Sequence, residues 1–297
     1  MTSASGGGAV LGPARYGKAE VRLLHVTRGA EDHRICDLTV STALSGDFAA
    51  TYLTGDNTGV LTTDAQKNAV YALARQQAPL PAEEFGQRLG RHFVSAAPVQ
   101  RARVRVEQHG WRRLDAAGAP HPHSFERQSG TRIASVMSQV GGGSEVVAGT
   151  GDLVLLKSTG SEFRDFLRDE YTTLAPASDR ILATVVDARW RFAVPPPDWD
   201  VSFAAAAGAL REAFALSYSK SLQQTLYAMG ESVLAACPEA CEVRLSLPNK
   251  HHFLVDLSPF GLDNPGTVFH AADRPYGLIE GSVLRPDAPP GDPDHDW

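Results

Sequence analysis

The chain has 297 residues, of which 43% are hydrophobic, and its 28 basic and 34 acidic side chains give a formal net charge of -6. This balance supplies no positive surface for nucleic acid or for an anionic membrane. No apolar run approaches the roughly 18 residues that a membrane-spanning helix needs, so we expect a soluble, cytoplasmic protein whose partner is a small molecule. The length favours two medium-sized domains.

Three cysteines, Cys36, Cys237 and Cys241, are too few and odd in number for a disulfide framework. Cys237 and Cys241 are spaced as Cys-x3-Cys, but a structural zinc site needs four ligands and no second pair of that spacing is present. We therefore expect ordinary thiols in a reducing compartment.

The first half shows strand patterns, then helix patterns, then strand patterns again. Alternating apolar residues predict strands, and apolar residues three or four positions apart predict helices. Thr63-Asp64 is typical of a helix start, and Pro79 and Pro81 separate two helices. The predicted elements are strands over 18–28, 34–44 and 60–62, a helix from 63 to the first proline, a helix from 81 through 93, and strands over 99–109 and 123–137.

The second half repeats this order without obvious sequence identity to the first. A stop at Pro195-Pro196-Pro197 separates its first strands from two Ala- and Leu-rich helices. The predicted elements are strands over 146–157 and 181–194, helices over 199–215 and 221–236, and strands over 242–247 and 253–257.

Two such halves predict an α+β fold: tandem ββααββ repeats that form an antiparallel sheet with helices on one face. Gly141-Gly142-Gly143 between the halves reads as a turn, because no GxGxxG spacing accompanies it. The predicted organisation is a flexible N-terminal tail over 1–15, a first repeat over 16–143, a second repeat over 144–285 and a disordered, Pro- and Asp-rich tail over 286–297.

No Walker loop, serine elbow, HExxH or Cys-rich metal pattern is present, so any chemistry must come from dispersed residues. Taken singly, the polar candidates have ordinary structural explanations. A lysine at a strand start is usually solvated, Thr63-Asp64 can simply cap a helix, and Arg180 can pair with Asp179 or Asp187.

Six segments, in order and spread from about Tyr16 to Val283, together resemble the urate oxidase family. They are Tyr16-Gly17-Lys18, Thr62-Thr63-Asp64-Ala65-Gln66-Lys67-Asn68, His121-Pro122-His123-Ser124-Phe125, Leu167-Arg168-Asp169-Glu170-Tyr171-Thr172-Thr173-Leu174, Asp179-Arg180-Ile181-Leu182 and Leu247-Pro248-Asn249-Lys250-His251. The resemblance implies the tunnelling fold, with two repeats in each subunit and a homotetramer built around a barrel with a central tunnel. It also implies oxidation of urate by molecular oxygen to 5-hydroxyisourate and hydrogen peroxide, with no metal or organic cofactor.

The resemblance also implies which residues bind the substrate, and their chemistry suits a purine anion. Arg180 and Gln223 would bond the edge of the purine, since a guanidinium and an amide supply directional bonds to its carbonyl oxygens and ring nitrogens. Phe163 would stack on the ring face. Leu222 and Asp64 would each contribute a backbone amide.

In the same resemblance, Lys18 and Thr63 form a proton relay with His251, and Thr63 also contacts substrate. A lysine can act as a base only where burial or a neighbouring charge lowers its pKa. Asn249 would hold oxygen, or the attacking water, above the ring. The relay residues Lys18 and Thr63 lie in the first repeat, whereas Arg180 and Gln223, which would bind the purine edge, lie in the second. The family pattern therefore implies active sites shared between subunits.

Two rival functions stay open. His121 and His123 could place two imidazoles on one strand face as ligands of a metal-dependent tunnelling-fold cyclohydrolase, although Pro122 disfavours a regular strand there. The chain could also be a non-catalytic purine- or pterin-binding protein. The end in Asp296-Trp297, without a Ser-Lys-Leu tail, favours a cytoplasmic member of bacterial type.

Overall fold

The computed structural model describes residues 9–76 and 79–291 and contains eight strands and six helices in the described residues. Hydrogen bonds join the strands in chain order, β1 to β8, into an eight-stranded sheet. The elements are β1 (Tyr16–Arg28), β2 (His33–Gly46), α1 (Ala49–Leu53), α2 (Thr63–Gln76), α3 (Ala82–Val94), β3 (Val99–Ala116), β4 (Ala119–Gln139), β5 (Ser144–Lys157), β6 (Leu182–Phe192), α4 (Trp199–Leu216), α5 (Leu222–Ala236), β7 (Ala240–Leu254), η1 (Ser258–Phe260) and β8 (Phe269–Leu284).

The predicted α+β fold of two ββααββ repeats is confirmed in this order of elements. Contacts divide the chain into two compact units, one of residues 1–108 and 134–146, the other of residues 109–133 and 147–297. The proposed repeat boundaries stay a prediction, and the predicted tails lie partly outside the described residues. No helix of the described chain is long and apolar enough to cross a membrane.

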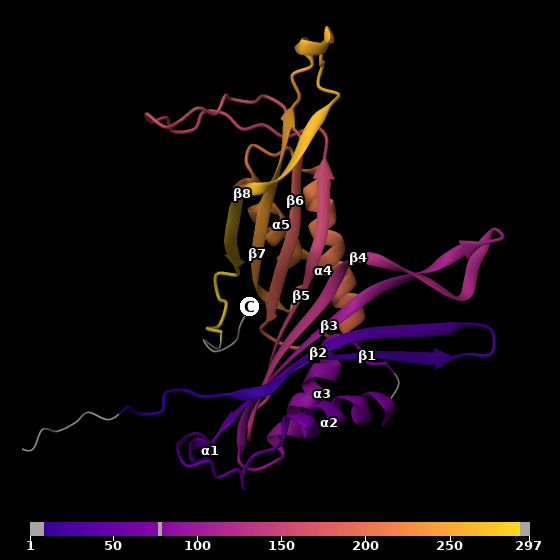
Figure 1. Ribbon diagram of the computed structural model, residues 1–297, viewed down its shortest axis with the longest axis vertical. Coiled ribbons are helices and arrows are strands. Elements are labelled where there is room, and N and C mark those ends of the chain that lie inside the picture. The colour runs from indigo at the N-terminus through magenta and orange to yellow at the C-terminus, as the bar shows by residue number, and fades with distance from the viewer. Residues whose placement is uncertain (1–8, 77–78, 292–297) are drawn as a thin grey trace, which may run out of the picture. The chain divides into compact units, whose positions relative to one another are not determined.

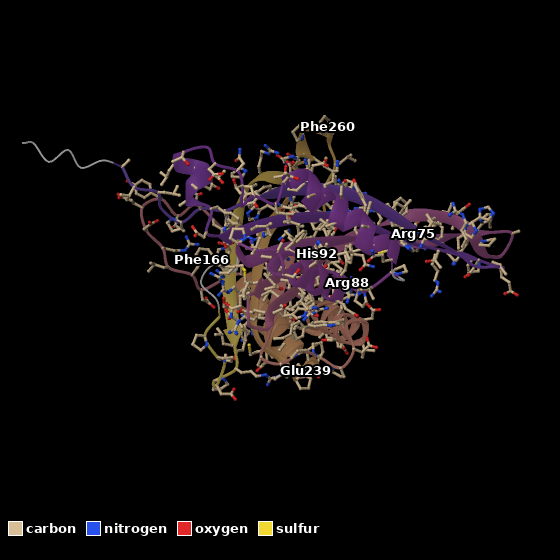
Figure 2. The ribbon with its side chains drawn as sticks, turned by 90° about the horizontal axis from the view of Figure 1, so that it is seen from below. Arg75, Arg88, His92, Phe166, Glu239 and Phe260 are labelled. Carbon is tan, nitrogen blue, oxygen red and sulfur yellow. The ribbon has the colours of Figure 1, made fainter. Side chains whose placement is uncertain are left out.

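In the first unit α2 and α3 lie together beside β1 and β2 (Figure 1), and α2 packs on β1. The apolar faces of these elements form one buried cluster that includes Val40, Leu44, Leu89 and Phe93. Helix α3 approaches β4 closely: a Cβ added at Gly90 would lie 2.2 Å from Ser138 Oγ. The missing side chain therefore permits the contact between helix and sheet. Figure 2 marks Arg88 and His92 on this helix.

A β-bulge in β1 decides which face of the sheet Lys18 occupies. The register with β2 joins Lys18 to Thr42 and Val21 to Val40, so Ala19 and Glu20 together oppose a single residue. Glu20 has φ 56°, in the left-handed region. In a regular strand positions 18 and 21 would face opposite sides. The extra residue restores Lys18 to the side on which Val21 is buried.

In the second unit α4 and α5 lie side by side against one face of the strands (Figure 1), with α5 contacting β7 and β8. Asp198 caps α4 by accepting hydrogen bonds from Asp200 N and Val201 N, and Ser221 caps α5. The largest fully buried side chain is Trp190 on β6. The first strand here also carries a bulge, at Asp152 with φ 56°, which supports the repeat.

The last two predicted strands of the second half form one strand. Alternation predicts separate strands over 242–247 and 253–257, but β7 is continuous from Ala240 to Leu254 and residues 255–257 lie outside it. Its partner β8 was not predicted. The β6–β7 register shows no pairs for Val185–Val186 with Leu247–Pro248, the point at which the proline has no N–H to donate. The short strand at 60–62 is also absent, and α1 was not predicted.

Candidate active site

In the first unit, Lys18 lies near the start of α2, where Thr63 and Asp64 are located. Asp64 accepts hydrogen bonds from Lys67 Nζ at 2.6 Å and Asn68 Nδ2 at 2.9 Å. The bond and charge of Lys67 lower the pKa of Asp64 most, and the charge of Lys18 adds to this. Three of the predicted site residues therefore gather within one unit.

The cap of α2 is Thr62, not the predicted Thr63-Asp64 pair. Thr62 Oγ1 accepts the hydrogen bond of Ala65 N at 3.0 Å. Thr63 is the first helical residue and is half-buried. Its hydroxyl is therefore not used as the cap of its own helix.

In the second unit, residues 160–163 lie between the segment at Ser219 and the segment at Ala177, and they bring the predicted substrate-binding residues Phe163 and Arg180 together. On one side Glu162 N donates to Ser219 O at 2.8 Å and Ser219 N donates to Gly160 O at 3.0 Å. On the other side Phe163 exchanges backbone bonds with Ala177 at 2.8 and 2.9 Å. Together with the bond from Arg180 N to Ser161 O at 2.8 Å, these ladders fix Phe163 beside Arg180.

Arg180 is a half-buried cation that no acid neutralises within the described residues. Its guanidinium carbon lies 5.1 Å from the centroid of the Phe163 ring. Burial lowers the pKa of Arg180, and its buried Nε has no hydrogen-bond partner. Asp179 instead accepts bonds from Thr159 Oγ1, Gly160 N and Ser161 N, and Asp187 pairs with Arg189. The structural ion pair considered for Arg180 is therefore not formed.

Phe163 also stacks on Phe166, with ring centroids 5.1 Å apart and an interplanar angle of 13°. Figure 2 labels Phe166 on the extended segment that follows β5. Arg164 lies between Phe163 and Phe166 in sequence, and its Nε donates to the buried carboxylate of Glu162 at 3.1 Å. The same carboxylate also accepts from Tyr218 Oη at 3.0 Å. This basic residue beside Phe163 therefore compensates a buried acid.

Helix α5 begins with the other two candidates, Leu222 and Gln223. The Leu222 side chain is buried in the core, which leaves its backbone for any ligand contact. Gln223 is exposed, whereas its neighbour Gln224 is bonded to Lys220 N at 2.9 Å. The loop that leads to this helix is the one bonded to residues 160–162 through Ser219.

Asn249 and His251 lie on the same face of β7 as the buried Leu245 and Leu247, because side chains alternate along a strand. The alternating faces place His252 on the opposite side, so only His251 accompanies Asn249. Burial, and then the charges of Arg180 and His252, lower the pKa of His251. His251 thus lies within electrostatic range of Arg180.

A family model described as Uricase matches residues 14–136 and 146–280. The chain belongs to the uricase family. It is similar to a uricase from Arthrobacter globiformis, with 50% identity over 277 residues that cover 93% of this chain and 90% of the relative. A uricase from Dictyostelium discoideum is 38% identical, covering 91% and 96%. The crystal structure of the Arthrobacter globiformis uricase has a TM-score of 0.91, with 49% identity, and covers 96% of this chain and 98% of that chain.

This membership disfavours the cyclohydrolase alternative. His121 and His123 do lie together, with ring centroids 4.5 Å apart. Within residues 9–76 and 79–291, no three His, Cys, Asp or Glu side chains are grouped so as to hold a metal ion.

Sequence reasoning missed the residues that hold the site together, such as Asp179, Glu162 and Ser219 as partners of the loop. Each of them forms a hydrogen bond that involves the backbone of a residue distant in the chain, which no local sequence pattern predicts. The family resemblance was the only signal in this part of the sequence. Thr42 was missed for the same reason, because its pairing with Lys18 depends on the bulge.

Proposed function

We propose that the chain is a urate oxidase that converts urate, oxygen and water to 5-hydroxyisourate and hydrogen peroxide without a metal or organic cofactor. The observation that carries the proposal is Arg180, a desolvated guanidinium over Phe163 with no acid paired to it in the described residues, in a chain of the uricase family. A partly desolvated cation is stabilised by an anion that forms directional hydrogen bonds. Urate is such an anion, and its flat ring suits the face of Phe163.

Each half of the site has a separate task in this proposal. Arg180 and Gln223 bond the edge of the purine, and backbone amides of Leu222 and Asp64 add donors. Lys18 and Thr63 remove and pass the proton that urate must lose before it gives electrons to oxygen, with His251, held neutral by its lowered pKa, as the next acceptor. Asn249 holds oxygen or the attacking water. The electrons come from urate, so the reaction balances without an external reductant.

The proposed assembly is a cytoplasmic homotetramer in which two subunits complete each site. Lys18, Thr63 and Asp64 belong to one unit, whereas Arg180 and Gln223 belong to the other. A two-fold axis that joins the first unit of one subunit to the second unit of its partner would create two equivalent sites.

Oxygen uptake on the addition of urate tests the proposed activity. We expect one oxygen consumed and one hydrogen peroxide formed for each urate lost, and unchanged activity after exhaustive chelation. Tight binding of urate without oxygen uptake would instead support the non-catalytic binding protein. Activity that returned only with added zinc, copper or iron would contradict the cofactor-free reaction.

A further inference from the structure

We infer that Thr42 and Gln66 are positioning residues, a buried hydroxyl and amide that fix the backbone of Lys18 against the start of α2, where Thr63 lies. The inference rests on the proposed function, because Lys18 and Thr63 matter as a pair only if they pass a proton. In the proposed function neither Thr42 nor Gln66 binds substrate or passes the proton.

The bulge of β1 creates the need for such a pair. It turns Lys18 to the buried side of the sheet and interrupts the regular ladder between Lys18 and Val21. Two hydroxyl groups of β2 accept hydrogen bonds from backbone N–H groups at this point. Lys18 N donates to Thr42 Oγ1 at 3.2 Å, and Glu20 N donates to Ser41 Oγ at 2.9 Å. The backbone of Lys18 is therefore held by a side chain.

A chain of hydrogen bonds then continues from β2 to α2. Thr42 Oγ1 donates to Gln66 Oε1 at 2.7 Å, and Gln66 Nε2 donates to Leu61 O at 3.3 Å. The alternative acceptor of the Thr42 proton, Lys18 O, is more distant at 3.4 Å. The amide has one orientation that satisfies both neighbours, since its oxygen must face the hydroxyl and its nitrogen the carbonyl.

Because Thr42 and Gln66 are buried, the loss of one hydrogen-bond partner in this chain should be costly. Gln66 is fully buried and Thr42 is 6% exposed, so water cannot easily replace a missing partner. Leu61 precedes Thr63 by two residues, and Gln66 N also donates to Thr62 O at 3.0 Å. One side chain therefore ties the segment around Thr63 to the strand of Lys18, which sets the separation of the two relay residues.

Kinetics of the full-length protein, with urate affinity measured separately without oxygen, test the inference. Thr42→Val removes the hydroxyl at nearly constant volume, and Gln66→Leu removes the amide. We expect each to lower kcat about 10- to 100-fold, because a relay displaced by roughly 1 Å loses rate of this order, while anaerobic urate affinity changes less than about threefold. Thr42→Ser, which keeps the hydroxyl, should retain kcat within about threefold of wild type.

Thr39→Val is the matched control, because it makes the same change on the same strand at a hydroxyl that accepts from Arg22 Nη1. Its kcat should stay within about twofold of wild type. The double variant Thr42→Val/Gln66→Leu should lose no more rate than the worse single variant, since both act in one chain of bonds. Unchanged kcat in Thr42→Val, or equal loss in Thr42→Ser and Thr39→Val, would overturn the inference.

Hydrogen exchange of the Lys18 amide separates this inference from the proposed function. Thr42→Val should speed exchange of Lys18 N–H about tenfold or more by removing its acceptor, and Thr39→Val should not. If the wild-type protein failed to oxidise urate, the proposed function would fall, yet this difference would still support the positioning of Lys18. Equal protection in both variants would refute it.

Discussion

In the proposed site, Arg180 is the residue on which we expect the binding of urate to depend most directly. Replacing Arg180 with Ala removes a charge-assisted hydrogen-bond donor from a desolvated position, so urate affinity should fall by about 2 to 5 kcal/mol. Gln223→Ala should cost less, because its amide is neutral and exposed. Anaerobic binding measurements decide the matter, and unchanged affinity of the Arg180 variant would remove the pocket assignment.

In the proposed reaction we expect Lys18 and Thr63 to affect a different step from Arg180, the transfer of the proton. Lys18→Met should lower kcat by about 10² to 10⁴-fold, the usual contribution of a positioned acid or base, with little change in affinity. Thr63→Ala should lower kcat far more than affinity as well. Steady-state kinetics combined with anaerobic binding give the comparison. A variant that mainly raised KM would show that its residue binds substrate and does not move the proton.

His251 should remain neutral below the usual histidine pKa of about 6.5. Burial and, second, the charge of Arg180 lower its pKa. On acidification, kcat/KM should therefore begin to decrease only below that pH. The folded chain binds this proton more weakly than the unfolded chain, and stability should decrease as pH drops from about 6.5 toward the lowered value. Arg180→Gln should raise the His251 pKa in an NMR titration. A fall, or no change, would show that the two groups do not interact.

At the scale of elements, two helix glycines offer a matched comparison. An Ala side chain at Gly90 would lie 2.2 Å from Ser138 Oγ and 2.9 Å from Ser138 Cβ. We expect Gly90→Ala to destabilise the protein by about 1 to 3 kcal/mol through overpacking, despite the better helix propensity of Ala. Urea unfolding at fixed protein concentration provides the measurement.

Gly208, on α4, is the control, because an added Cβ meets nothing within 4 Å. Gly208→Ala should stabilise by about 0.5 to 1 kcal/mol. Gly90→Ala/Ser138→Gly should recover stability relative to Gly90→Ala alone. A Gly90→Ala protein as stable as wild type would mean that α3 and β4 pack less closely than the structure describes.

At the scale of the whole molecule, mixed subunits test whether sites are shared. Thr63→Ala and Arg180→Ala should each be nearly inactive alone. In a hybrid pair of the two, one site would carry both changes and the other none, so equal random pairing should restore about a quarter of wild-type activity. Co-expression with differently tagged chains, followed by mass spectrometry, would verify the hybrids. Inactive hybrids would place the complete site within one subunit.

The repeated order of strands and helices was predictable because alternation and helical spacing are local properties of the sequence. The failures occurred where local chemistry and tertiary pairing disagree. Pro248-Asn249 has the composition of a turn, yet β7 continues through it, since the partner strands supply the remaining bonds. β8, with Pro275 and two glycines, has no clear alternation and was missed.

The sequence by itself determined the family, the two-repeat α+β fold and the types of residue that could bind urate, because these follow from local pattern and from ordered motifs. It could not determine the face on which Lys18 lies, which depends on one extra residue at the Ala19–Glu20 bulge. Nor could it show that Arg180 lacks an acid partner among the described residues, since both Asp179 and Asp187 lie within seven positions of it in the sequence. Tertiary structure decided both, because each depends on hydrogen bonds between residues distant in the chain. Lys18 N donates to Thr42, and the Asp179 carboxylate accepts from the loop at 159–161 and does not pair with Arg180.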